Sequence, residues 1–195
     1  MNLSGLDVGF AVTGSFCTMA KALEQVEQLV KSGVNVFPVM SEMAASTDTR
    51  FGSAEYFREQ LSDLTGNEVI CTIKDAEPIG PKKLFDALII APCTGNTLSK
   101  LSAGITDSSV TMAANAHLRN ARPLLIAIST NDALGASYRN IGQLLNVKNI
   151  FFVPYGQDDP LKKQTSMIAD FSMIKPALEA ALSGVQLQPV IIKHN

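Results

Sequence analysis

The sequence contains few of the residues that bind transition metals. It has three cysteines, Cys17, Cys71 and Cys93, which lie far apart without a CxxC pair, and two histidines, His117 and His194. A zinc site needs several such ligands at short spacings, so we expect no metal site. The cysteines are interpreted as small buried thiols, although Cys17 and Cys93 fall in loops of the expected binding face.

Long apolar runs and an excess of basic charge are also absent. No apolar segment approaches the roughly 20 residues that a membrane-spanning helix needs. Residues 1–7 lack the basic start and apolar centre of a signal peptide. The net charge of −2 leaves no basic footprint for nucleic acid. We therefore expect a cytoplasmic protein that binds neither membrane nor nucleic acid.

What is present is an apolar chain of single-domain size. Apolar residues make up 46% and charged residues 17% of the 195 positions, which suits a compact core. Continuous apolar runs predict buried strands at 6–12, 34–39, 85–91, 123–128 and 149–153, with a weaker candidate at 67–73. Helical spacing predicts helices at about 19–30, 54–64, near Leu98, 109–120, 138–145 and 166–182.

Alternating strands and helices predict the fold class. We expect an α/β protein with a flavodoxin-like or Rossmann-like doubly wound parallel sheet, as a three-layer αβα sandwich. Residues 1–195 are predicted to form one domain, with a core at about 6–155 and a C-terminal helix and tail at 156–195. The polar segment 156–165 is predicted to be a loop, and Pro176 to kink or break the last helix.

The segments after the strands carry small, hydroxylated or amide residues. In a doubly wound sheet the ligand lies outside the carboxyl ends of the strands. Gly14 lets the backbone approach a ligand closely, and Ser15, Thr18 and Ser41 add hydroxyl donors. One such loop alone is more typical of an ordinary turn or helix cap. Four loops at one edge, those at 13–18, 41, 92–97 and 129–132, favour an anion-binding site.

The sequence lacks the fingerprints of two common nucleotide sites. Gly14 begins no GxGxxG motif, and no glycine-rich loop ends in Gly-Lys-Ser or Gly-Lys-Thr. A dinucleotide site of the usual kind and an NTPase site are therefore not expected in this chain.

At this point the loops resemble those of a known family. Pro92-Cys-Thr-Gly-Asn-Thr97 resembles the Pro-Ala-Ser-Ala-Asn-Thr motif of the homo-oligomeric flavin-containing Cys decarboxylases. Thr13-Gly-Ser15 and Ser41 resemble the FMN-phosphate loops of that family, and the resemblance covers about 6–155. Within this superfamily the chain resembles the dipicolinate synthase B subunits most, through the segments 46–52, 65–69, 76–81, 127–135, 152–158 and 187–190.

The resemblance implies FMN as the cofactor and assigns residues to it. Gly14, Ser15, Thr18 and Ser41 would hold the phosphate and ribityl chain. The segment Thr94, Gly95, Asn96 and Thr97, with Pro92 before it, would line the isoalloxazine. Asn131 retains the last residue of the family's Pro-x-Met-Asn motif. Ser109 would place its N–H near the phosphate, unless Asp107 simply caps the helix that follows.

The resemblance also implies a reaction and partners. It implies oxidation of a dihydrodipicolinate-type precursor to pyridine-2,6-dicarboxylate in the mother cell of a spore-forming bacterium. An A subunit would carry NADP, and this chain would form a homo-oligomer such as a trimer or dodecamer. Whether FMN takes electrons or is structural stays open at this stage.

Three residues are candidates for catalysis. Arg50 offers the fork-shaped cation that a small dicarboxylate needs, and Asp48 would orient it or act as a base. A simple salt bridge within the loop is an equal alternative. Asn96 offers a donor and an acceptor for a flavin edge or a substrate carboxylate, or else forms a turn.

Departures from the family motifs keep two other functions open. The decarboxylases carry a catalytic histidine after the second strand, and the segment 41–52 contains none, which disfavours decarboxylation. The alternatives are another flavin enzyme of the superfamily, such as a decarboxylase or a flavin prenyltransferase, and a non-catalytic assembly subunit.

Overall fold

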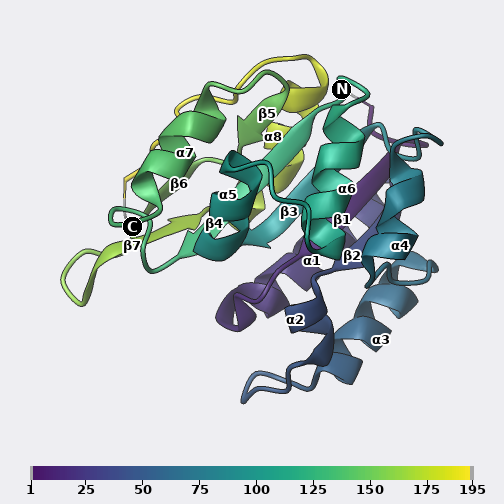
Figure 1. Cartoon of the computed structure of the whole chain (residues 1–195), viewed down its shortest axis with the longest axis horizontal. Coiled ribbons are helices and arrows are strands. Elements are labelled where there is room, and N and C mark those ends of the chain that lie inside the picture. Colours follow the sequence, from purple (N-terminus) through teal and green to yellow (C-terminus); the bar gives the residue numbers. More distant parts are fainter. Residues whose placement is uncertain (1, 194–195) are drawn as a thin grey trace.

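A parallel sheet forms the centre of the molecule. The computed structural model describes residues 2–193. Five parallel strands lie in the order β2-β1-β3-β4-β5, a doubly wound arrangement in which strand order reverses beside β1 (Figure 1). They are β1 (Asp7–Val12), β2 (Asn35–Met40), β3 (Ala87–Cys93), β4 (Leu124–Thr130) and β5 (Ile150–Phe152).

Two antiparallel strands extend this sheet. β5 pairs only with the first half of β4, and β7 (Lys163–Ala169) pairs with its end, through Ser129 with Ile168 and Thr130 with Met167. β6 (Tyr155–Asp159) pairs with β7 in a hairpin. The predicted loop at 156–165 and the first half of the predicted helix at 166–182 are therefore wrong.

The last helix begins later than predicted. The short 3-10 helix η3 (Phe171–Met173) leads into α8 (Ile174–Leu182). Pro176 lies in the first turn of α8, where its missing N–H would have no partner within the helix. The predicted break at this proline is thus a helix start.

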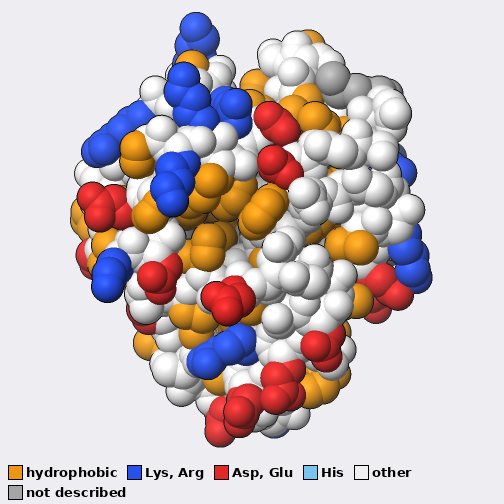
Figure 2. Space-filling view, turned by 90° about the vertical axis from the view of Figure 1, so that its right-hand side faces the viewer, with side chains coloured by type: hydrophobic (Ala, Val, Ile, Leu, Met, Phe, Trp, Pro, Cys, Tyr) orange, Lys and Arg blue, Asp and Glu red, His pale blue; other side chains and the backbone are white. Residues whose placement is uncertain are grey.

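Helices cover both faces of the sheet. α1 (Met19–Lys31) and α8 pack together on one face, and α5 (Gly95–Ser102), α6 (Ser109–Leu118) and α7 (Tyr138–Leu145) lie on the other (Figure 1). α3 (Ala54–Thr65) packs against α1 and β2 at the β2 edge. Figure 2 shows the molecule from the right-hand side of Figure 1, where apolar side chains gather in the middle of the face.

Short elements follow β2. They are α2 (Glu42–Ser46), α4 (Ile73–Ala76) and the 3-10 helix η2 (Glu77–Ile79). The strand predicted at 67–73 reduces to one parallel bridge between Ile70 and Val39. The chain leaves the sheet at once because Thr72 caps α4, accepting a hydrogen bond from Asp75 N–H.

The core explains why the parallel strands read as continuous apolar runs. Every residue of β3 is buried, and β4 is buried as far as Ser129. Strands that are covered on both faces have no solvent-exposed side, so their sequences contain continuous apolar runs and not an alternation of apolar and polar residues. Within residues 2–193, no helix has the length and apolarity that a membrane span requires. The same residues contain no cluster of three or more Asp, Glu, His or Cys side chains that could hold a metal.

Candidate functional site

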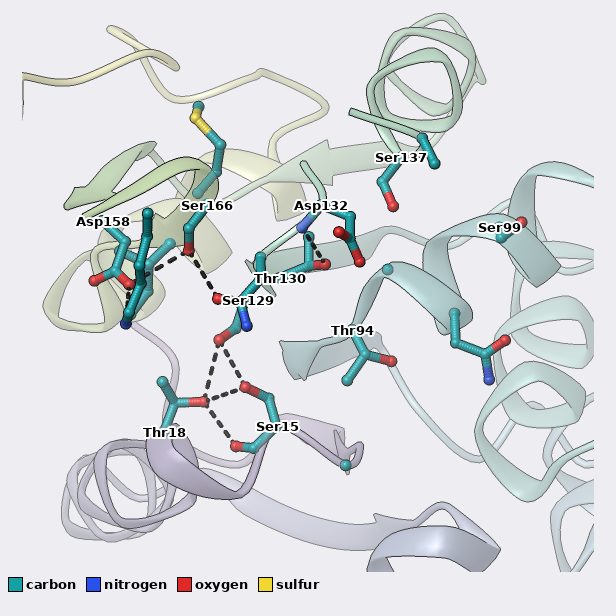
Figure 3. Close-up of a pocket in the computed structure, with 18 of the residues that line it drawn as sticks. Ser15, Thr18, Thr94, Ser99, Ser129, Thr130, Asp132, Ser137, Asp158 and Ser166 are labelled. Carbon is teal, nitrogen blue, oxygen red and sulfur yellow. Dashed lines mark hydrogen bonds and ion pairs between the residues drawn. The ribbon is translucent and has the colours of Figure 1, made fainter. Parts of the chain in front are cut away.

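A cavity of about 720 Å³ opens at the carboxyl ends of β1, β3 and β4 (Figure 3). Its walls come from four places: the turn after β1 with the 3-10 helix η1 (Phe16–Thr18), the start of α5, the segment between β4 and α7, and the β6–β7 hairpin. Seven of the residues predicted from the sequence line it: Gly14, Ser15, Thr18, Thr94, Gly95, Asn96 and Asn131.

Three hydroxyl groups form a cluster on one wall. The Oγ atoms of Ser15 and Ser129 lie 2.8 Å apart, and Thr18 Oγ1 lies 3.0 Å from Ser15 Oγ and 3.3 Å from Ser129 Oγ. Figure 3 shows these side chains converging from the ends of β1 and β4. A hydroxyl both donates and accepts, so the cluster can turn its donors toward an anion.

A buried threonine joins the loops after β1 and β3. The Thr13 hydroxyl donates to the Pro92 carbonyl at 2.7 Å and accepts from Thr94 N–H at 3.1 Å. Thr94 then caps α5 by accepting from Thr97 N–H at 3.3 Å. Pro92 and Thr97 therefore hold the 92–97 segment in shape but do not line the cavity themselves.

The two glycines of the cavity wall differ in what surrounds them. A Cβ atom at Gly95 would lie 2.7 Å from both Ser137 Oγ and Thr130 Oγ1, so any larger residue there requires these hydroxyl groups or the backbone to shift. At Gly14 the nearest atom would be 3.6 Å away, which is ordinary contact distance. The protein itself therefore tolerates a side chain at Gly14, whereas a ligand against this backbone would not.

The hairpin contributes a charged pair linked to Asn131. Lys163 Nζ lies 2.7 Å from Asp158 Oδ2, and Ser166 Oγ lies 3.3 Å from both Asp158 Oδ2 and Asn131 Oδ1. The hydrogen bond and charge of Lys163 lower the pKa of Asp158, and Asp158 in turn raises the pKa of Lys163. Both groups therefore stay ionised and paired near neutral pH.

Two of the residues predicted to bind the phosphate, Ser109 and Ser41, form hydrogen bonds within the protein instead. Ser109 is fully buried, donating its hydroxyl to the Met40 carbonyl at 2.5 Å and its N–H to Glu42 Oε1 at 2.9 Å. The Glu42 carboxylate thus already takes the N–H that the sequence assigned to a phosphate. Ser41 caps α2 by accepting from Ala44 N–H at 3.2 Å. Neither serine lines the cavity.

The two charged residues predicted for catalysis also lie off the cavity of this chain. Asp48 Oδ1 accepts from Ala54 N–H at 2.9 Å and so holds the start of α3. The Arg50 guanidinium lies over the ring of Phe51, with 4.8 Å from Cζ to the ring centre. No ion pair joins Asp48 and Arg50 among residues 2–193, so the alternative of a loop salt bridge is not realised either.

Four charged residues that line the cavity were not predicted from the sequence: Lys21, Arg139, Asp158 and Lys163. Lys21 lies one turn beyond Thr18 on α1, and Arg139 lies in the first turn of α7. Asp158 and Lys163 were missed because their segment was predicted to be a loop. The spacing of Ser15, Thr18 and Lys21 was the available indication, since residues three apart share one helix face.

Three comparisons place the chain among known proteins. A family model described as Flavoprotein matches residues 1–176. The B subunit of dipicolinate synthase from Bacillus subtilis is 47% identical over 193 residues, covering 99% of this chain and 96% of the relative. The crystal structure of the dipicolinate synthase B subunit from Bacillus halodurans C superposes with a TM-score of 0.92 at 43% identity, covering all of both chains.

A more distant structure shares the fold alone. It is a dodecameric FMN-dependent Ubix-like decarboxylase from Escherichia coli O157:H7, with a TM-score of 0.62 and 20% identity. The likeness covers 76% of this chain and 80% of that one.

Proposed function

The chain belongs to the flavoprotein family, and from this premise we propose that its cavity holds FMN and that it serves as the B subunit of a dipicolinate synthase. In this role it takes part in oxidising a dihydrodipicolinate-type precursor to pyridine-2,6-dicarboxylate. The observation that carries the proposal is the convergence of Gly14, Ser15, Thr18, Thr94, Gly95 and Asn96 on one cavity.

The donor set of the cavity fits an organic phosphate. The volume of about 720 Å³ lies within the usual range of small-molecule sites. The hydroxyls of Ser15, Thr18 and Ser129 form one wall, and Lys21 adds a positive charge on the same side. The open space over Gly14 allows a phosphate to approach the backbone.

The opposite wall fits a flat ring with polar edges. Thr94, Gly95 and Asn96 lie at the start of α5, where backbone N–H groups have no partner within the helix. The carboxamides of Asn96 and Asn131 each offer a donor and an acceptor. We propose that these groups orient the ring and that FMN, when bound, supplies two-electron redox chemistry.

The proposed oxidation needs an acceptor for a hydride and a partner subunit in addition to this chain. Aromatising a dihydropyridine removes a hydride and a proton, and FMN in this cavity or NADP on an A subunit would supply the hydride acceptor. We propose the A subunit and self-association as parts of the working enzyme, supported by the similarity to a named B subunit and by the dodecameric relative of the same fold.

An absorbance titration of the purified chain with FMN tests the proposal. We expect stoichiometric binding, seen as a shift of the flavin bands, and dipicolinate formation once an A subunit, NADP and precursor are added. A chain that ignores FMN yet activates the A subunit would make it an assembly subunit and overturn the flavin proposal.

The titration needs matched variants to locate the site. Ser15→Ala removes a hydroxyl of the cavity wall, whereas Ser183→Ala removes an exposed hydroxyl at the end of α8. We expect roughly tenfold weaker FMN binding for the first variant, because a hydrogen bond to a charged group is lost. The second variant is expected to bind FMN as the unaltered chain does.

A further inference from the structure

Arg139 is a cation on the cavity wall that has no hydrogen-bond or ion-pair partner among residues 2–193. It lies in the first turn of α7 and lines the cavity beside Ser137 and Asn140. Among the residues that the structure describes, none accepts a hydrogen bond from its guanidinium or forms an ion pair with it. Asp132, an acidic residue of the same wall, is also not bonded to it.

The other two cations of the cavity, Lys21 and Lys163, lie near Asp158. Lys163 is paired with Asp158 at 2.7 Å, and Lys21 is close enough to Asp158 to help lower its pKa. Lys21 also follows Ser15 and Thr18 on the side proposed for the phosphate. With Lys21, Arg139 and Lys163 against Asp132 and Asp158, the wall carries one positive charge more than negative.

We propose that Arg139 binds one carboxylate of the substrate and selects a dicarboxylate over a monocarboxylate. A planar guanidinium matches a carboxylate with two parallel hydrogen bonds, which a lysine cannot do. Asn140, the next residue along α7, lines the same wall, and its side chain is held by a hydrogen bond that its Oδ1 accepts from Ser102 Oγ at 3.1 Å. Arg139 thereby takes the role that the sequence assigned to Arg50.

This assignment rests on the proposed function for the identity of the dicarboxylate, but its test does not require catalysis. The full chain, with and without FMN, is titrated calorimetrically with pyridine-2,6-dicarboxylate and with pyridine-2-carboxylate. The variants are Arg139→Gln, Arg139→Lys and, as a matched control, Arg119→Gln. Arg119 is an exposed arginine at the end of α6 and lies outside this cavity.

The unaltered chain is expected to prefer the dicarboxylate, and Arg139→Gln to weaken its binding by roughly 10- to 100-fold, the value of a lost charge-assisted pair. The variant should then bind the dicarboxylate about as weakly as the unaltered chain binds the monocarboxylate. Arg139→Lys should recover part of the loss, and the Arg119→Gln control should bind both ligands as the unaltered chain does.

Separate outcomes decide the two proposals. FMN binding with dicarboxylate affinity that ignores Arg139, or no dicarboxylate binding at all, overturns the role of Arg139 and leaves the flavin site standing. An equal loss of FMN and dicarboxylate in Arg139→Gln also overturns it, because the residue would then shape the cavity as a whole. Loss of dicarboxylate binding in a chain that never binds FMN keeps the role of Arg139 and removes the flavin proposal.

Discussion

At the scale of single residues, a substitution at Gly14 should affect ligand binding without affecting the stability of the fold. A methyl group there meets Met43 and Phe16 side chains only at ordinary contact distances, with 3.6 Å the shortest. Gly14→Ala should therefore fold with unchanged stability but bind FMN roughly tenfold more weakly, since a close phosphate contact is lost. Flavin titration and thermal unfolding measure the two effects.

The control for Gly14→Ala is Gly142→Ala on the exposed face of α7, where nothing lies within 4 Å of the added carbon. This variant should bind FMN normally and gain up to about 1 kcal/mol, because alanine is the better helix former. If both variants bind FMN alike, the phosphate does not approach Gly14.

At Gly95 we expect the opposite, namely that an added methyl group lowers the stability of the fold. Its added Cβ atom would lie 2.7 Å from Thr130 Oγ1 and from the oxygen of the buried Ser137. Gly95→Ala should lower the free energy of unfolding by about 1–3 kcal/mol, the usual cost of overpacking. Urea unfolding checks this value, and a variant as stable as the parent would show that the Thr130 and Ser137 side chains or α5 move aside without cost.

His117 ties stability to pH. Burial is the main cause that lowers its pKa from 6.5 to about 4, so the neutral ring donates from Nε2 to the Pro123 carbonyl at 3.0 Å. Between pH 6.5 and about 4 the imidazole of His117 binds a proton in the unfolded chain but stays neutral in the folded chain. The contribution of neutral His117 to the free energy of unfolding is therefore complete above pH 6.5 and is lost as the pH falls toward 4.

The free energy of unfolding falls by about 3 kcal/mol at most, because the pKa of His117 falls from 6.5 to about 4 and each pKa unit corresponds to about 1.36 kcal/mol. Urea unfolding between pH 4 and 8 measures it for the parent and for His117→Gln, which cannot titrate. The two stability curves should run parallel above pH 6.5 and converge below it. Parallel curves over the whole range would exclude His117 as the source.

At the scale of elements, the β6–β7 hairpin joins the sheet over a short stretch at the end of β4. Only two residue pairs connect β7 with β4, and Ser166, which is 3% exposed, bridges Asp158 and Asn131. We expect faster amide hydrogen exchange in β6 and β7 than in β3, whose residues are all buried. Ser166→Ala should raise exchange in the hairpin roughly fivefold further, for the loss of about 1 kcal/mol.

The Ser183→Ala variant removes the hydroxyl at the C-cap of α8, which donates to the Glu179 carbonyl away from the hairpin, and it should leave hairpin exchange unchanged. Equal exchange in β3 and the hairpin would show that both open only by global unfolding.

This hairpin is also where prediction from sequence failed. Its strands are polar, with residues Gln157, Asp158 and Asp159 in β6 and Lys163 and Gln164 in β7, so no buried run marked them. The five parallel strands were predictable because each is covered by helices and contains an apolar run. The cavity was half predictable for the same reason: residues after the strands were found, whereas those contributed by the hairpin and by α7 depend on tertiary packing.

At the scale of the whole molecule, the exposed apolar surface bears on assembly. Apolar side chains gather on the face over α3, α4 and α6 (Figure 2). On the segment that follows β2, Met43, Phe51 and Tyr56 are 63%, 46% and 48% exposed. Apolar side chains gathered at a surface favour a protein contact. Asp48 and Arg50 belong to the same segment, so their predicted catalytic roles require it to reach the cavity of a second copy.

We therefore expect the purified chain to form a homo-oligomer that depends on this segment. Phe51→Asp places a charge in the contact and should shift the mass measured by light scattering toward the monomer, because a buried unpaired charge is costly. Leu161→Asp is the matched control, since Leu161 is 89% exposed at the hairpin turn. A monomeric parent chain, or a Phe51→Asp variant that assembles as well as Leu161→Asp, would contradict the assignment. An assembly that dissociates together with a loss of FMN affinity would show that a second copy completes the cavity, and it would make Asp48 and Arg50 candidates for catalysis again.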